Sequence, residues 1–295
     1  MADEFTLYFQ RFPETPVAGK RLGWHRLHDS RSDAYQFRAV RAVPVVSKEW
    51  PRHIPILDQG NLGSCTGNAM TGAAGTDPLW PALPSGHVTL DEREAIALYS
   101  AATKLDPYPG SYPPTDTGSD STSVNKAAQQ AGLTSGYTHA TSAGDVLQAL
   151  MAGPVTLGIP WYEGFDDPDA NGVVSIAGSI RGGHEIVCRR VDITRKLIGP
   201  DNSWGTSFGV NGSFWFSFDD LDRLLGEGGD CVCPVPLTAP APVPVPVPVP
   251  PGGDPAVQTF LADTIVESWA SSNHHGAARH VASAISALRS AEQGG

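Results

Sequence analysis

The sequence predicts an α+β fold in two lobes, one helical and one built from antiparallel strands, and three observations favour it. Helical patterns dominate up to about residue 151, and short apolar runs with a period of two dominate after Gly153. Chains that place helices first and strands second are typical of α+β architecture. A lone Cys65 lies in the first half and His184 in the second. The line where the lobes meet would form a cleft.

The chain opens with a segment, residues 1–50, that has scattered aromatics and no sustained period. We expect an extended leader that packs against the domain, and the sequence leaves open whether it is removed as a propeptide. Its first residues lack the basic and apolar regions of a secretory signal, so no signal peptide is predicted.

Four helices are expected in the first half. The first runs from about Cys65 to Gly75, where small residues allow close approach of neighbours. The second covers Thr89 to Lys104, with acidic residues in its first turn and apolar residues at helical spacing. Two shorter helices are expected at 124–131 and 142–151.

Four strands are expected in the second half, at 154–160, 185–191, 196–198 and 214–216. The main folded domain, which carries Cys65 and His184, would therefore span residues 51–237. Proline at every second position makes 238–253 a stiff polyproline linker. Residues 254–295 then predict a helical hairpin, which is too small to bury a core alone. It should dock on the main domain of its own chain, on another copy or on a larger assembly.

Composition limits the possible partners. The chain has 295 residues, 40% hydrophobic residues and a formal net charge of −11. Nucleic-acid phosphates would be repelled by this charge, and no apolar run approaches the roughly 20 residues of a membrane span. We expect no nucleic-acid or membrane partner and, without a signal peptide, a cytoplasmic or virion-associated location. The abundance of Ala, Gly and Pro suggests a bacterial or phage source.

The four cysteines are too few and too clustered for a disulfide framework, which favours a reducing compartment. Cys188 lies in an apolar run and is expected to be a buried strand residue. Cys231 and Cys233 supply two metal ligands without partners, so no metal site and no cofactor are predicted.

The stretch around Cys65 reads Asp58-Gln59-Gly60-Asn61-Leu62-Gly63-Ser64-Cys65 and continues into small, helix-tolerant residues. A thiol at a helix N-terminus meets unpaired N–H groups and the positive end of the helix dipole, which favour the nucleophilic thiolate. The spacing also lets the Gln59 amide and the Cys65 N–H converge as an oxyanion hole.

Two later segments supply what such a thiolate needs. His184 opens an apolar run after two glycines, and Asn202 precedes Ser203-Trp204-Gly205 in a glycine-punctuated loop. A histidine could act as the acid and base for the thiol, while a neutral asparagine could orient its ring.

These motifs together resemble the papain-like (C1) cysteine peptidases, and most of all their bacterial branch, whose motif tends to read DQG-x-LGSC-T-x-NA. His184 and Asn202 follow Cys65 by roughly 120 and 140 residues, near the separation of about 130–150 found in papain-type enzymes. The resemblance covers roughly residues 20 to 235.

The resemblance implies a papain-like two-lobe fold with the cysteine on the helical lobe and the histidine and asparagine on the β lobe. It implies Cys65 as nucleophile, His184 as base and acid, Asn202 as its orienter and Gln59 as oxyanion donor. It also implies that substrate contacts come from four further residues, of which the last would also shield the Asn202–His184 hydrogen bond: Gly118, Ser119, Gly183 and Trp204.

The expected function is hydrolysis of peptide bonds through a thioester, by an endopeptidase rather than an exopeptidase. Two alternatives remain: an amidase or transpeptidase that acts on cell-wall peptides, and a catalytically silent binding protein. The orientation of Glu185 is also open. Facing the cleft, it could raise the pKa of His184 or favour basic substrate groups, and facing outward it would do neither.

Overall fold

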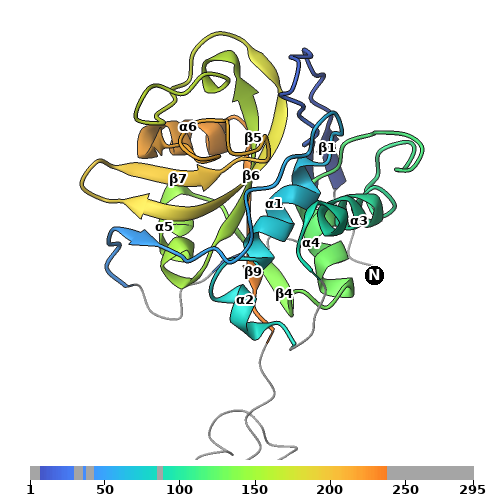
Figure 1. Cartoon of the computed structure of the whole chain (residues 1–295), viewed down its shortest axis with the longest axis horizontal. Helices are drawn as coiled ribbons and strands as arrows, with labels where there is room; N and C mark the ends of the chain where they lie inside the picture. Colours follow the sequence, from blue (N-terminus) through green and yellow to red (C-terminus); the bar gives the residue numbers. More distant parts are fainter. Residues whose placement is uncertain (1–6, 30–35, 38–42, 85–88, 238–295) are drawn as a thin grey trace, which may run out of the picture. The chain divides into compact units, whose positions relative to one another are not determined.

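The computed structural model describes residues 7–29, 36–37, 43–84 and 89–237. The linker expected at 238–253 and the hairpin expected at 254–295 lie outside the described residues. In the described part the α-helices are α1 (Cys65–Ala74), α2 (Leu79–Ala82), α3 (Glu92–Ala102), α4 (Ser121–Gln130), α5 (Ala143–Ala152) and α6 (Phe218–Gly226) (Figure 1). The strands are β1 (Leu7–Gln10), β2 (Arg26–Asp29), β3 (Lys48–Glu49), β4 (Gly136–Ala140), β5 (Val155–Tyr162), β6 (Ile180–Asp192), β7 (Leu197–Asp201), β8 (Phe216–Ser217) and β9 (Asp230–Val235).

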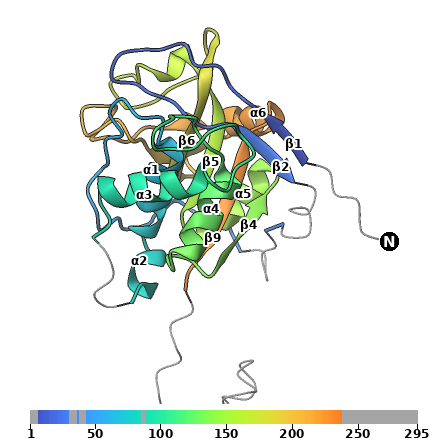
Figure 2. The ribbon, with the colours of Figure 1, turned by 90° about the vertical axis from the view of Figure 1, so that its right-hand side faces the viewer.

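One lobe is helical, and α1 lies at its centre against α3, α4 and strand β6 (Figure 2). Every residue of α1 is buried, which its small side chains make possible. At Gly67 a Cβ would overlap the backbone carbonyl of Ala95 in α3, so only glycine allows this helix-helix distance. Met70, Leu98 and Val124 belong to the apolar core of this lobe.

The other lobe is an antiparallel sheet of seven strands in the order β4-β9-β5-β6-β7-β8, with β3 paired to β6. Helices α5 and α6 pack on this sheet, and its core holds Trp161, Phe165, Phe214 and Phe216. The α+β fold in two lobes that the sequence predicts is confirmed. The cysteine begins a helix of one lobe, and the histidine lies in a strand of the other.

Some boundaries differ from the expected ones for identifiable reasons. Helix α4 begins at Ser121, before the expected residue 124, because the Asp120 side chain caps it by accepting from the Ser123 N–H. Strand β6 starts at Ile180, because residues 180–184 pair with β5 and place His184 inside the strand rather than at its start. Strands β4 and β9 and helix α6 were not predicted.

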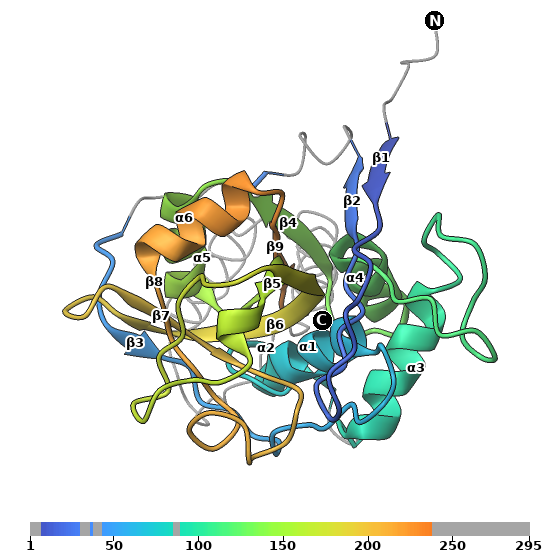
Figure 3. The same cartoon turned by 90° about the horizontal axis from the view of Figure 1, so that it is seen from above.

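The leader enters as β1, which pairs antiparallel with β2. Between them, residues 11–25 form a loop that passes between the sheet and α3, over the start of α1 (Figure 3). Farther on, β3 adds to the sheet beside β6, and the Trp50 indole N–H donates to the Leu150 carbonyl oxygen at 2.7 Å. The leader therefore contacts both lobes.

None of the helices in the described part of the chain combines the length and the apolar character that crossing a bilayer requires.

Candidate active site

Cys65 is the first residue of α1 and is fully buried. The residue before it, Ser64, makes no side-chain capping bond, so the first backbone N–H groups of the helix stay available near the thiol. The N–H groups of Glu185 and Thr66 face the sulfur and favour its ionised form. The first of these belongs to the residue after His184, so the thiol lies directly against strand β6.

His184 is held in place through one ring nitrogen. Its Nε2 lies 2.7 Å from Oδ1 of Asn202, a separation typical of a strong hydrogen bond. Because Oδ1 can only accept, this contact places the proton of a neutral ring on Nε2. The other nitrogen, Nδ1, has no hydrogen-bond partner among the described residues, which leaves it free to take a proton.

Two tryptophans enclose the His184 ring. The Trp161 ring centroid lies 4.8 Å from that of His184, edge to face, and the Trp204 centroid lies 5.0 Å away. Trp204 is only 5% exposed, so its ring covers the side of His184 that bonds to Asn202.

The loop that carries Asn202 is anchored by its neighbour, Asp201. This carboxylate has no exposed side-chain surface, and it lies 3.2 Å from Arg52 and 2.7 Å from Arg189. Burial alone would raise the pKa of Asp201, but these arginines and Arg190 lower it below its usual value. An ionised, multiply bonded Asp201 therefore fixes the end of β7 from which Asn202 projects.

Gln59 lies in the turn before Cys65 and is oriented by two contacts. Its Oε1 accepts from the Ser203 hydroxyl at 2.6 Å, and its Nε2 donates to the Leu62 carbonyl oxygen at 2.8 Å. The second Nε2 hydrogen remains for another acceptor. Ser203 therefore ties Gln59 to the Asn202 loop across the two lobes.

Burial opposes the thiolate that the position of Cys65 at a helix N-terminus favours. Burial raises the pKa of the Cys65 thiol far above its usual range, with smaller contributions from the charges of Glu185 and Glu14. Burial also lowers the pKa of His184 to about 3, despite the bond to Asn202. Burial therefore favours the uncharged form of both groups in this arrangement.

The leader provides this burial. The Ser119 N–H donates to the Gly23 carbonyl oxygen at 2.9 Å, and the Gly183 carbonyl oxygen accepts from the Gly23 and Trp24 N–H groups at 3.0 and 2.9 Å. A Cβ at Gly118 or Gly183 would overlap leader backbone, so both glycines are needed for this approach.

The leader also reaches Trp204, whose indole N–H donates to the Arg21 carbonyl oxygen at 2.9 Å. All four residues expected to contact substrate, Gly118, Ser119, Gly183 and Trp204, thus lie against the leader.

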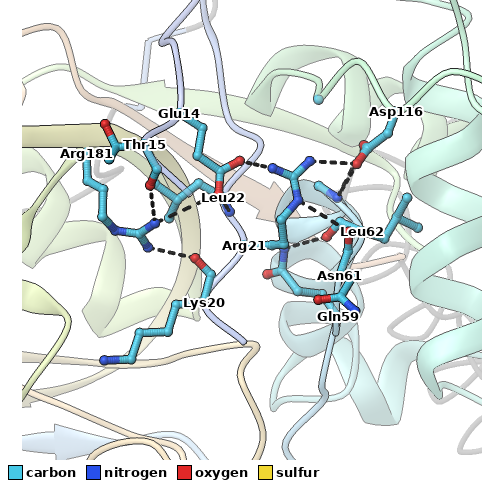
Figure 4. Close-up of polar contacts among 12 residues, drawn as sticks. Glu14, Thr15, Lys20, Arg21, Leu22, Gln59, Asn61, Leu62, Asp116 and Arg181 are labelled. Carbon is cyan, nitrogen blue, oxygen red and sulfur yellow. Dashed lines mark hydrogen bonds and ion pairs between the residues drawn. The ribbon is translucent and has the colours of Figure 1, made fainter. Parts of the chain in front are cut away.

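Two arginines hold the leader in position (Figure 4). Arg21 pairs with Glu14 within the leader and with Asp116 of the helical lobe at 2.7 Å. Arg181 of β6 donates to the carbonyl oxygens of Thr15 and Lys20 at 2.9 and 2.7 Å. The leader is therefore attached to both lobes, with Cys65 beneath it.

Sequence reasoning did not single out Arg21, Arg181, Asp116 or Ser203. None of them belongs to a motif with its own chemistry, and their roles depend on which distant segments the fold brings together.

No protein-family model and no curated protein sequence matches this chain. Solved structures do match. The crystal structure of xylellain, a cysteine protease from Xylella fastidiosa, aligns over 76% of this chain and 99% of its own, with a TM-score of 0.62 and 15% identity. Digestive procathepsin L 3 of Tenebrio molitor larval midgut aligns over 68% of this chain and 74% of its own, with a TM-score of 0.52 and 15% identity. The chain therefore has the fold of the papain-like cysteine proteases.

Proposed function

We propose that this chain is a cysteine peptidase of the papain-like family, from its bacterial branch, and that it cleaves within peptide chains. One arrangement carries the proposal. His184 is oriented by Asn202 through Nε2, keeps Nδ1 free, and belongs to the strand segment that faces the Cys65 thiol at the start of α1. The motif around Gln59 and Cys65 supports assignment to the bacterial branch.

The reaction would be acyl transfer. His184 takes the thiol proton on Nδ1, and the sulfur of Cys65 attacks the peptide carbonyl carbon, which forms a C–S bond. The Cys65 N–H and the free Nε2 hydrogen of Gln59 stabilise the oxyanion. The imidazolium then protonates the leaving amine as the C–N bond breaks, and water, deprotonated by His184, hydrolyses the thioester.

The leader must leave the cleft before a substrate can enter, since it uses the hydrogen-bonding groups of Ser119 and Gly183. Its departure would admit water to the site. A thiolate and an imidazolium stabilise each other, so hydration would restore the reactive ion pair that burial suppresses.

Cleavage within chains is supported by the length of the cleft. The leader lies in the cleft as a loop that turns at residues 17–20, and its two arms meet where the Phe12 N–H donates to Nδ1 of His25 at 3.2 Å. Beyond Trp204 lies a cavity of about 360 Å³ lined by Phe208, Lys20 and the segment 166–168. A substrate chain that displaced this loop would have room to continue past Trp204 into that cavity.

The experiment makes two measurements on the full chain and on Cys65→Ala. The first is hydrolysis of an unfolded, carboxymethylated substrate protein, and the second is covalent adduct formation with a peptidyl chloromethyl ketone, detected by mass spectrometry. We expect the substitution to abolish both, with a loss of hydrolysis on the order of 10⁴-fold or more. The matched control is Cys188→Ala, a buried free cysteine in strand β6, which should keep both activities.

A catalytically silent binding protein is the second candidate, and the burial and neutrality of Cys65 and His184 favour it. If Cys65 reacts no faster than an ordinary thiol, even when the leader is loosened by Arg21→Ala, the peptidase proposal fails and the silent protein is the better description.

A further inference from the structure

The leader places one large side chain, Trp24, in a pocket between the lobes. Trp24 is fully buried, and its indole N–H donates to the Ser121 hydroxyl at 2.9 Å. The ring lies over Gly158 in β5, where a Cβ would overlap it. The pocket therefore exists because strand β5 carries a glycine there, and its depth suits a long side chain with a donor group near its end.

The floor of this pocket is acidic. Gly158 is paired in register with Glu185 on β6 and with Asp230 on β9. Directly opposite residues on neighbouring strands point to the same face of a sheet, so both carboxyl groups flank the glycine on the face that Trp24 covers. Asp120, just before α4, is a third buried carboxyl close enough to raise the pKa of Glu185.

Glu185 lacks a cation. Its side chain is 1% exposed, and neither carboxyl oxygen has a hydrogen bond of ordinary geometry within the described part of the chain, although the hydroxyls of Thr156 and Ser121 lie nearby. No charged nitrogen from the described segments pairs with it, whereas Asp230 has His139 at 3.1 Å. A buried carboxyl without a partner is costly, which is consistent with the strong rise in its pKa on burial.

A metal ion does not fit this cluster. No three histidine, cysteine or carboxylate side chains converge as a metal site anywhere in the residues that the structure describes. Organic cations make fewer geometric demands, since a guanidinium can donate to separate carboxylates and hydroxyls at once.

We propose that the pocket now filled by Trp24 is a substrate side-chain pocket that selects a long cationic residue, arginine above all, with Glu185 as the specificity-determining residue. The guanidinium would take the place of the indole N–H beside Ser121 and pair with the Glu185 carboxylate. Asp230 and Asp120 would add to the negative potential. The claim that this pocket binds a substrate side chain rests on the proposed peptidase function. The claim that the pocket prefers a cation does not.

The leader itself can serve as the probe. In the full chain with Cys65→Ser, we compare Trp24→Arg with Trp24→Met, an apolar side chain of similar reach, each with and without Glu185→Gln. With Glu185 present, the arginine variant should melt about 4–8 °C higher than the methionine variant, from one or two charge-assisted hydrogen bonds. With Glu185→Gln the difference should vanish. Glu94→Gln on α3, outside the pocket, is the matched control and should leave the difference intact.

In the chain with Trp24 in place, Glu185→Gln should not lower the melting temperature, since no cation is then lost. An arginine variant that melts below the methionine variant in both backgrounds would overturn the proposal. So would a difference that survives Glu185→Gln, because the cation would then be bound elsewhere.

A second measurement relates the pocket to catalysis. Peptide pairs that differ only by arginine or norleucine, placed at each position in turn, are tested on the active chain. We expect one position to prefer arginine by tenfold or more in kcat/KM, and Glu185→Gln to reduce that preference to near unity. Hydrolysis without such a preference refutes the substrate assignment alone. If no peptide is hydrolysed but the melting temperatures show the expected dependence on Glu185, only the peptidase function is refuted.

Discussion

Gly158 shows how one missing side chain shapes the site. A Cβ at this position would overlap the Trp24 ring, which cannot shift because it is enclosed on all sides. We therefore expect Gly158→Ala to expel Trp24 from its pocket and to lower the free energy of unfolding by about 1–3 kcal/mol, as overpacked cores do. Thermal or urea denaturation measures the loss.

The matched control is Gly226→Ala at the end of α6, where a new Cβ meets nothing within 4 Å. It should be neutral or slightly stabilising, since alanine is the better helix former. If the two variants were equally stable, the close fit of Trp24 over Gly158 would be wrong.

At the level of single residues, the sequence predicts which side chains could react better than it predicts which residues surround them. The spacing of Cys65, His184 and Asn202 identified residues that the fold does bring to one place. The sequence could not show whether Glu185 faces the cleft, because that depends on the register of β6 against β5. Nor could it show that Ser203 orients Gln59, a contact between segments that lie far apart in the chain.

The leader is the element whose contacts decide whether the site is open. Arg21 pairs with Glu14 inside the leader and links the leader to Asp116 and to the Asn61 carbonyl oxygen. Arg21→Ala should make leader opening easier by about 1.5–3 kcal/mol, the usual worth of hydrogen bonds to charged groups. Alkylation of Cys65 by iodoacetamide at pH 7 should then be about 10- to 100-fold faster, as measured by mass spectrometry.

Lys20→Ala is the comparison within the same loop. Lys20 pairs with Asp167, which is 92% exposed, and exposed pairs of this kind contribute little. It should change the alkylation rate less than threefold. Equal rates in the Arg21 and Lys20 variants would mean that the leader is not held by the arginine contacts.

Elements with a strong local signal were predicted well. Both ends of helix α3 lie within two or three residues of the expected bounds, because Asp91 caps the helix and its apolar residues keep a helical period. Strand β9 was not predicted, because its stability comes from pairing with β4 and β5 rather than from its own residues. The path of the leader through the cleft was also beyond local patterns, since it depends on contacts with both lobes.

Across the whole molecule, different buried ionisable groups make the free energy of unfolding change with pH in opposite directions. The pKa of His184 falls to about 3 on burial, so the unfolded chain binds this proton more readily between about pH 3 and 6.5. Stability contributed by His184 therefore rises with pH in that window. The carboxyls around the Trp24 pocket act in the other direction. Burial raises the pKa of Asp120 to about 7, aided by Asp106 and Asp230, and that of Asp106 to about 6.

Asp120→Asn separates these two effects. The raised pKa of Asp120 means that the folded state binds its proton more tightly than the unfolded state between about pH 4 and 7. This contribution is present below about pH 4 and is lost as the pH rises through 7. Asparagine keeps the cap of α4 but carries no charge, so the variant should gain stability over the parent as the pH rises. We expect a gain on the order of 2–4 kcal/mol between pH 4 and 8, since each pKa unit corresponds to about 1.4 kcal/mol.

Urea denaturation at a series of pH values measures this gain in the free energy of unfolding, with Asp219→Asn at an exposed position as the control. A stability difference that stays constant with pH would show that Asp120 is ionised throughout, and that the acidic cluster imposes no cost on the closed protein.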